Sequence, residues 1–448
     1  MKCDTPNILF VNPWIHDFAA YDFWAKPMGL LILAAVLRQH GFSVSYLDCL
    51  DRFRPKAPYT NPYARHGRGA YLKKQIPKPK GLEDVPRNFS RYGVMPDWFR
   101  EDLLSIAKPD LILITSLMTY WYPGVQEAIK IIKDTFPNTP VVLGGIYATL
   151  CYPHAASQSG ADKVIKGPGE KHILKLAADY TGFSAKIKFD PDNLDTYPYP
   201  AFDLQSKITY IPLLTSTGCP FSCDYCASHF LSPRRMQRSP ESVVAEIRYW
   251  HEKYGVVDFV FYDDALLVDP EKHVIPVLEG IIKNGLKACF HTPNAVHVRE
   301  ISKKTASLMF KAGFKTVRLG LETAVFGKTN ELDRKVTADE FKQAVKFLKD
   351  AGFHKRQVGA YLLVGLPGQT SASIEDSIKT VRQTGITPVP AYYSPIPETA
   401  MWERAAAASR YDLKSDPVFT NNSIFPCQKE AFSWKTIAYL KKMTLAAI

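Results

Sequence analysis

The sequence lacks the segments that would direct a chain into or across a membrane. Its first residues, MKCDTPNILFVNPW, have no charged leader, apolar core or small-residue cleavage site. No apolar run approaches the ~20 residues that a helix needs to span a bilayer. We therefore expect a cytoplasmic protein without a membrane partner.

Cysteine is also too sparse for a chain held together by disulfides. There are eight cysteines in 448 residues, and in a reducing compartment they are expected to remain thiols. Clustered cysteines then indicate metal ligands or reactive thiols. Three of the eight lie close together, at positions 219, 223 and 226.

Acidic residues are fewer than basic ones, and the formal net charge is +12. Between Asp51 and Arg100 there are twelve Lys or Arg residues and only four Asp or Glu residues, so most of the excess lies in one segment. Nucleic-acid binding is therefore not expected. The basic segment is interpreted either as a solvated surface insertion or as a flap that meets an anionic ligand or partner.

Strand and helix patterns alternate in the N-terminal part. Apolar runs at 7–13, 42–49, 109–116 and 140–145 predict strands, and amphipathic stretches at 28–41, 124–137 and 171–180 predict helices. This alternation predicts an α/β domain over residues 1–182 with a doubly wound (Rossmann-like) parallel sheet and a basic insertion at 51–100. Ligands of such sheets bind at the carboxyl ends of the strands. Those ends predict a binding edge formed by Asn12, Thr115, Ser116, Gly144, Gly145, Gly169 and Glu170.

A second α/β series follows a linker expected at residues 183–206. Six strand–helix repeats between 207 and 405 predict a partial (β/α)6 TIM-like barrel, and residues 406–448 form a C-terminal extension. The reactive face of such a barrel lies at the carboxyl ends of its strands. The cysteine loop follows the first strand and is therefore expected on that face.

The cysteine loop, "TSTGCPFSCDYCASHF", contains the spacing C-x3-C-x2-C. Three thiolates can bind three corners of a four-iron four-sulfur cluster and leave one iron without a protein ligand. The alternative is a structural zinc ion held by the three cysteines and His229. Structural zinc sites usually take their ligand pairs from separate knuckles, whereas all four residues here lie in one short loop. The pattern favours the cluster.

The loop resembles that of the radical S-adenosylmethionine superfamily, whose motif is C-x3-C-x-aromatic-C with Tyr225 here as the aromatic residue. The resemblance covers roughly residues 207–405. The preceding segments "ILFVNP", "PDLILITS", "VVLGG" and "KGPGE" resemble a cobalamin-binding-type domain. The resemblance implies three cofactors, a 4Fe-4S cluster bound by Cys219, Cys223 and Cys226, S-adenosylmethionine, and cobalamin at the binding edge named above.

The resemblance also assigns S-adenosylmethionine contacts. These are Tyr225 beside the adenine, Asp263 and Asp264 in the methionine-binding segment, Asn294 and Glu322 for ribose or amino groups, and Gly365 and Pro367 in the loop after the fifth strand. The family more often has glycines at 263 and 264, and many members have Glu at position 369, where this chain has Gln. Structural alternatives are a helix cap for the two aspartates and an ion pair between Arg318 and Glu322. Gly144 and Gly145 could likewise form a turn without a ligand.

These features predict a cobalamin-dependent radical methyltransferase that acts on an unactivated carbon of a small-molecule or peptide substrate. A one-electron reductant such as flavodoxin or ferredoxin is the expected partner. The alternatives are a radical enzyme that performs cyclisation, rearrangement or oxidation, and a non-catalytic iron–sulfur or zinc protein. Cys427, beyond the barrel, is a candidate catalytic thiol. The D-x-H-x-x-G motif is absent and His16 has the wrong spacing, so no histidine ligand to cobalt is expected.

Overall fold

The computed structural model describes residues 5–326, 336–428 and 434–445. The chain forms two compact units. The N-terminal unit comprises Met1–Thr209 with Ser415–Val418, and the barrel unit comprises Tyr210–Lys414 with Phe419–Ile448. Within the described ranges, every helix is too short or too polar to cross a bilayer.

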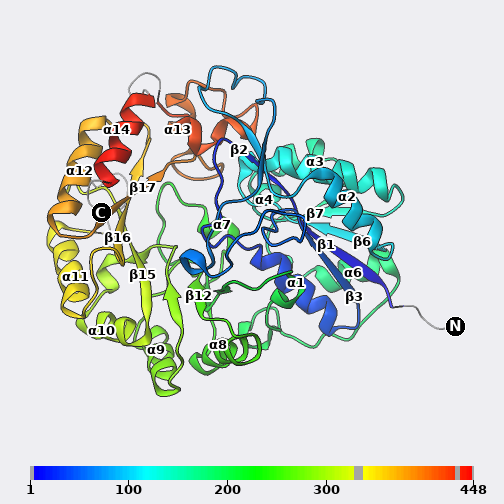
Figure 1. Cartoon of the computed structure of the whole chain (residues 1–448), viewed down its shortest axis with the longest axis horizontal. Coiled ribbons are helices and arrows are strands. Elements are labelled where there is room, and N and C mark those ends of the chain that lie inside the picture. The colour runs from blue at the N-terminus through cyan, green and yellow to red at the C-terminus, as the bar shows by residue number, and fades with distance from the viewer. Residues whose placement is uncertain (1–4, 327–335, 429–433, 446–448) are drawn as a thin grey trace. The chain divides into compact units, whose positions relative to one another are not determined.

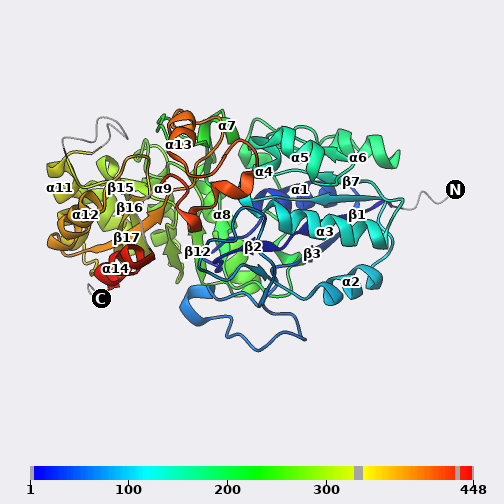
Figure 2. The same cartoon turned by 90° about the horizontal axis from the view of Figure 1, so that it is seen from above.

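The N-terminal unit is built on a five-stranded parallel sheet in the order β3-β1-β6-β7-β8. The strands are β1 (Asn7–Asn12), β3 (Ser43–Asp48), β6 (Leu111–Ile114), β7 (Val141–Leu143) and β8 (Lys163–Val164). Helix α1 (Met28–Gln39) packs against α6 (Ile173–Thr181), and α2 (Pro96–Ser105) packs against α3 (Tyr122–Thr135). Figure 1 shows α1 on one side of these strands and α2 and α3 on the other, and Figure 2 shows the same elements turned by 90°. The predicted doubly wound sheet is confirmed.

The basic insertion forms a small sheet together with the segment that follows β1. Its strands β4 (Lys73–Gln75) and β5 (Ser90–Tyr92) join β2 (Ile15–Asp17) in an antiparallel sheet in the order β2-β5-β4. Arg52 Nη2 lies 3.1 Å from Asp22 Oδ2, and each side chain is only 3% exposed. Because a buried ion pair is costly to break, this contact fixes the insertion to the loop that follows β2.

The short segment Ser415–Val418 belongs to the N-terminal unit although it lies far along the chain. Tyr122, the first residue of α3, donates its hydroxyl to Asp416 Oδ2 at 2.9 Å. The ring of Tyr122 stacks on Tyr147 with 5.6 Å between centroids. The unit is therefore completed by residues from the C-terminal part of the sequence.

In the described residues, the barrel unit has a seven-stranded parallel sheet. Six strands follow one another in the order β17-β16-β15-β13-β12-β9, and β14 (Val296–His297) pairs with β15 off this path. The six are β9 (Ile211–Leu213), β12 (Asp258–Phe261), β13 (Cys289–His291), β15 (Phe314–Glu322), β16 (Val358–Val364) and β17 (Thr387–Tyr392). The helices α8 (Pro240–Tyr254), α9 (Val274–Lys283), α10 (Lys303–Ala312), α11 (Ala338–Asp350) and α12 (Ser371–Gln383) follow successive strands. Figure 1 shows α9 to α12 as an outer layer around the strands. The predicted partial barrel is confirmed.

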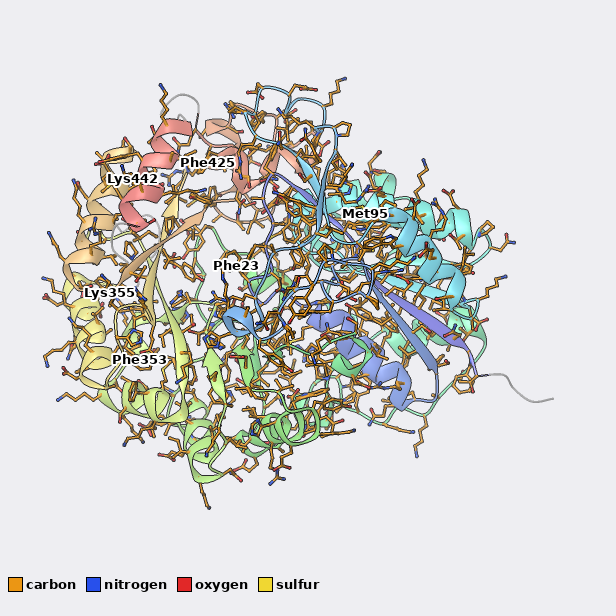
Figure 3. The ribbon with its side chains drawn as sticks, viewed as in Figure 1. Phe23, Met95, Phe353, Lys355, Phe425 and Lys442 are labelled. Carbon is orange, nitrogen blue, oxygen red and sulfur yellow. The ribbon has the colours of Figure 1, made fainter. Side chains whose placement is uncertain are left out.

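The C-terminal part of the barrel unit packs against its last strands. The ring of Phe425, labelled in Figure 3, meets Tyr392 at 5.1 Å, and Gln428 Nε2 donates to Leu366 O at 2.8 Å. Two further helices, α13 (Trp402–Ala408) and α14 (Trp434–Leu445), lie on either side of this segment in the sequence. Residues 419–428 thus cover the carboxyl end of the sheet near β16 and β17.

Candidate functional site

The cysteine loop is closed by a short antiparallel ribbon. Strand β10 (Ser216–Thr217) pairs with β11 (Met236–Gln237), so the residues between them form one loop after β9. Gly218 has φ +73, and a Cβ atom at this position would lie 2.7 Å from Arg234 O. Only glycine fits this close approach of the two sides of the loop. The three half-buried cysteines of the loop are thiols and form no disulfide.

The donor atoms of the loop suit a cluster better than a single ion. Four ligands around one zinc ion bring their donor atoms to within about 4 Å of one another. Among the described residues, no three of Cys219, Cys223, Cys226 and His229 bring ligand atoms within 4.8 Å of one another. The His229 ring instead contacts Phe230, with centroids 4.0 Å apart. Three separated thiols are the donor set that a four-iron cluster requires.

The two neighbouring aspartates after β12 have different surroundings. Asp263 is 2% exposed and accepts hydrogen bonds from the Thr215 hydroxyl at 2.7 Å and the Ser216 hydroxyl at 2.6 Å. The Thr215 hydroxyl also contacts His273 Nε2 at 2.8 Å, so Asp263 belongs to a buried network beneath the cysteine loop. Asp264 contacts the Ser228 hydroxyl beside the loop, and burial raises the pKa of its carboxyl group.

The next predicted residues also lie at strand ends. Asn294 Nδ2 donates to Tyr262 O at 2.7 Å, which links the ends of β13 and β12. Glu322 ends β15 with φ +61, after a register shift at Gly320. A left-handed backbone at a non-glycine residue is strained, and such strain is concentrated at functional sites. Arg318, the proposed structural partner of Glu322, donates to two backbone carbonyls.

Gln369 fixes the turn after β16. Its Oε1 atom accepts from Gly365 N at 2.8 Å and Leu366 N at 3.2 Å, and its Nε2 atom donates to Leu363 O at 2.8 Å. An ionised glutamate could accept the first two bonds but could not donate the third. The amide therefore suits the geometry of this turn, which contains Gly365 and Pro367.

Tyr225 and Cys427 belong to one apolar region of the barrel unit, Cys427 within a buried cluster and Tyr225 at its edge. Tyr225 packs against a cluster that contains Cys427, Tyr393 and Met401. The Cys427 thiol is 3% exposed and donates to Ala405 O at 3.7 Å. Burial raises the pKa of this thiol to about 12, so it is protonated at neutral pH.

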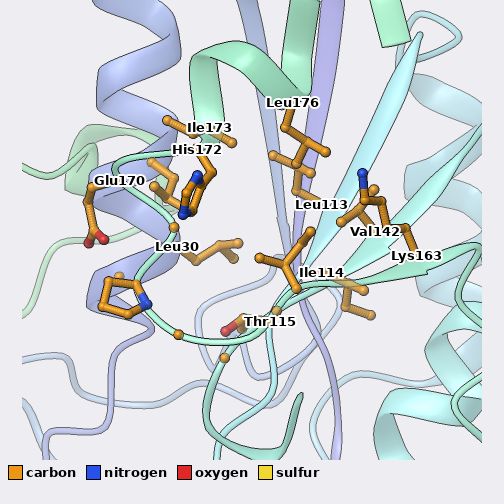
Figure 4. Close-up of a pocket in the computed structure, with 18 of the residues that line it drawn as sticks. Leu30, Leu113, Ile114, Thr115, Val142, Lys163, Glu170, His172, Ile173 and Leu176 are labelled. Atoms are coloured by element: carbon orange, nitrogen blue, oxygen red, sulfur yellow. The ribbon is translucent and has the colours of Figure 1, made fainter. Parts of the chain in front are cut away.

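The N-terminal unit contains an apolar cavity of about 390 Å³ at the carboxyl edge of its sheet. Figure 4 shows Leu30 of α1, Leu113 and Ile114 of β6, and Ile173 and Leu176 of α6 around it. Of the residues predicted for this edge, Thr115, Gly144, Gly145, Gly169 and Glu170 line the cavity. Burial raises the pKa of the Glu170 carboxyl group.

The other two predicted residues support this edge from outside the lining. Asn12 Nδ2 donates to Asp48 Oδ1 at 2.7 Å, which ties the ends of β1 and β3. Ser116 donates its hydroxyl to Gly144 O at 2.7 Å and so holds the turn after β7. His172 and Lys163 also line the cavity, although neither was among the predicted residues. No motif marks either residue.

His16 lies against Glu127, away from the cavity lining. Its Nε2 lies 2.8 Å from Glu127 Oε2, and Arg91 contacts the other oxygen of this carboxylate. Burial alone would raise the pKa of Glu127, but His16 and Arg91 together hold it below its ordinary value. His16 therefore has a local structural partner within its own unit.

Both parts of the chain are similar to known proteins. Residues 213–381 match the Radical SAM superfamily, and residues 94–177 match the B12 binding domain. An uncharacterized methyltransferase of Pyrococcus horikoshii, PH0819, is 28% identical over 70% of this chain and 74% of its own length. The anaerobic magnesium-protoporphyrin IX monomethyl ester cyclase of Rubrivivax gelatinosus is 27% identical over 64% of this chain, but the match spans only 56% of the cyclase.

A solved structure shares the fold over most of the chain. The radical S-adenosylmethionine methyltransferase TsrM from Kitasatospora setae, with tryptophan and a SAM analog bound, aligns with a TM-score of 0.67 and 17% identity. The alignment covers 91% of this chain and 78% of TsrM. A second structure of TsrM contains cobalamin and a [4Fe-4S] cluster and aligns with a TM-score of 0.65.

Proposed function

Because the chain belongs to the radical S-adenosylmethionine superfamily and carries a B12 binding domain, we propose that it is a cobalamin-dependent methyltransferase acting on an unactivated carbon. The observation that carries this proposal is the presence of two cofactor-type sites in one chain. One is the three-thiol loop after β9, and the other is the apolar cavity at the edge of the N-terminal sheet.

The residues of the barrel unit have separate roles in this proposal. Cys219, Cys223 and Cys226 hold three irons of a cluster and leave the fourth iron for S-adenosylmethionine. Asp264, beside the loop, is better placed for the amino group than Asp263, whose carboxylate is engaged by Thr215 and Ser216. Asn294 and Glu322, at the ends of β13 and β15, would hold ribose or amino groups of the ligand, and Tyr225 would pack beside its adenine. Gly365 and Pro367 shape the loop that Gln369 fixes.

The N-terminal unit holds the second cofactor. The apolar lining from α1, β6 and α6 excludes water from the bound ring system. Gly144, whose Cβ position is open, lets the backbone approach this ring system closely, while Gly145 packs the turn against Ser116. When bound, the cluster supplies the electron that cleaves S-adenosylmethionine to a 5′-deoxyadenosyl radical, and cobalamin supplies the methyl group. The same proposal includes a small-molecule or peptide substrate, a flavodoxin or ferredoxin as the reductant, and a cytoplasmic location.

A second candidate is radical cyclisation or oxidation without methyl transfer. The 27% identity to a protein named as a cyclase supports this second candidate. The two candidates differ in what the chain does before any substrate is added. A methyltransferase of this kind must accept a methyl group from S-adenosylmethionine onto reduced cobalamin, and this partial reaction needs no knowledge of the substrate.

The test uses the full chain reconstituted under anaerobic conditions with iron, sulfide and hydroxocobalamin. With a strong reductant and methyl-deuterated S-adenosylmethionine, we expect about four irons per chain, 5′-deoxyadenosine, S-adenosylhomocysteine and deuterium-labelled methylcobalamin. Formation of 5′-deoxyadenosine without labelled methylcobalamin would favour the second candidate. Stoichiometric zinc without iron would contradict both.

Cysteine variants provide the matched control. Cys219→Ala, Cys223→Ala and Cys226→Ala should each lose the iron and the production of 5′-deoxyadenosine. Cys289→Ala removes a half-buried thiol of β13 that lies outside the loop, and it should retain both. Equal losses in all four variants would show that the effect is one of folding.

A further inference from the structure

The sulfurs of Cys219 and Cys226 each have a hydrogen-bonding group of another residue beside them. Cys226 Sγ lies 3.2 Å from Ser228 Oγ and accepts from Ser228 N at 3.5 Å. These donors come from the start of α7 (Ser228–Leu231), two residues after the cysteine. Both groups are therefore part of the loop itself and move with it.

The donor beside Cys219 comes from a different part of the barrel unit. His297 Nε2 lies 3.9 Å from Cys219 Sγ, within reach of an N–H···S hydrogen bond. The two residues are 78 positions apart in the sequence. This contact connects the cysteine loop to the sheet, whereas the Ser228 contact does not.

Two features orient the imidazole of His297. The backbone of β14 pairs with β15 in parallel, with His297 opposite Gly320. On the loop side, the Phe221 ring lies 4.3 Å from the imidazole, measured between centroids. Phe221 is located between Cys219 and Cys223, so the aromatic contact and the sulfur contact act on the same short segment.

Hydrogen bonds to cluster sulfurs change the free energy of reduction. An added electron makes a cluster more negative, and a donor aimed at a thiolate sulfur stabilises that charge, so each such bond raises the reduction potential. An imidazole can supply this bond from one ring nitrogen as a neutral group. Removal of the donor should then lower the potential without removing a ligand.

We propose that His297 donates its Nε2–H to the thiolate of Cys219 and thereby raises the reduction potential of the bound cluster. The inference rests on the proposed cluster site but not on methyl transfer. His297 acts through Cys219 and is a positioning residue rather than a catalytic one. By tying the loop to β14, it also keeps the sulfur of Cys219 at a fixed distance from the sheet.

The experiment compares two substitutions in the full reconstituted chain. His297→Phe keeps a ring against Phe221 but has no donor, whereas His297→Gln keeps a donor. Potentiometry followed by electron paramagnetic resonance, in the absence of S-adenosylmethionine, gives the midpoint potential of each cluster. We expect a shift to more negative potential in His297→Phe and a smaller shift in His297→Gln, with full iron content in both.

His229→Phe is the matched control, because His229 lies three residues after Cys226 but contacts Phe230 rather than a cysteine. Its potential should equal that of the unmodified chain. Ser228→Ala keeps the backbone N–H that donates to Cys226 and should therefore change the potential less than His297→Phe does. If His297→Phe takes up less iron, the shift is measured on the loaded fraction.

Two results would overturn the inference. One is an unchanged potential in His297→Phe at full iron content. The other is a cluster whose resonance spectrum responds to S-adenosylmethionine only after His297 is replaced, which would make His297 an iron ligand. A failure of the unmodified chain to bind iron would instead contradict the proposed function, so the two failures are distinguishable.

Discussion

Gly144 and Gly145 offer a test of the N-terminal cavity, because the structure gives these adjacent residues opposite surroundings. Gly145 has φ +97 and ψ −165, and a Cβ atom there would lie 2.3 Å from Ser116 O and 2.7 Å from Ser116 N. Gly144 has no atom within 4 Å of the position that a Cβ would occupy. Both residues line the cavity.

The cost of Gly145→Ala can be estimated from these contacts. The backbone conformation of Gly145 is essentially restricted to glycine, and a substituted residue there is strained by about 1–3 kcal/mol. The new methyl group also displaces Ser116 O, which accepts the Ile146 amide at 2.7 Å, and weakening that bond costs about 1 kcal/mol. The sum is roughly 2–4 kcal/mol, which corresponds to a fall of roughly 5–15 °C in melting temperature for a unit of this size.

Gly144→Ala should behave differently. Its methyl group meets no protein atom, so the melting temperature should change by no more than about 2 °C. The methyl group would instead occupy cavity space and weaken cobalamin binding. Calorimetry of the full chain measures the transitions, hydrogen exchange of peptides from 105–160 assigns the affected one, and absorbance with hydroxocobalamin gives the affinity. Equal melting temperatures for the two variants would refute the reasoning.

Further predictions concern one buried histidine, one buried ion pair and the cobalt ligand. Burial lowers the pKa of His273 from its ordinary value of 6.5, so the unfolded chain binds this proton more tightly and the melting temperature should fall as the pH drops below 6.5. His273→Gln should reduce that fall, and an identical pH profile would argue against it. Arg52→Ala leaves the Asp22 carboxylate buried without its cation, and we expect a loss of roughly 3–5 kcal/mol in unfolding free energy. A loss below about 1 kcal/mol in denaturant titration would show that solvent replaces the cation. The cob(II)alamin form should show no nitrogen splitting from the protein in electron paramagnetic resonance, and triplets that vanish in His16→Ala or His172→Ala would contradict this.

The regular elements could be predicted because their sequence patterns are long. The helix expected at 28–41 and the strand expected at 109–116 each have one dominant periodicity, and both are present. The insertion strands β4 and β5 could not be predicted, because each has three residues and β5 also pairs with β2, which lies far earlier in the sequence. Helix α2 was not predicted, because the high content of charged residues and prolines around it indicated an irregular segment. The domain boundaries proposed from the sequence remain a prediction.

The candidate sites were predictable only where the residue types and their spacing are distinctive. The cysteine spacing and the strand-end glycines are visible in the sequence, whereas Leu30 of the cavity lining looks like any core residue of an amphipathic helix. The sequence also could not separate Asp263 from Asp264. Their different environments depend on Thr215 and Ser216, nearly fifty residues earlier. The roles of the site residues stay predictions until variants are measured.

The N-terminal unit is formed by two separate stretches of the sequence, which limits how it can be exchanged between related proteins. A fragment that ends near Thr209 would contain every strand of its parallel sheet but would lack Asp416, the acceptor of the Tyr122 hydroxyl. Tyr122 begins α3, the helix that follows β6. The unit therefore could not be exchanged between homologues with a single crossover in the sequence. A functional chimaera would have to inherit residues 1–209 and 415–418 from the same parent.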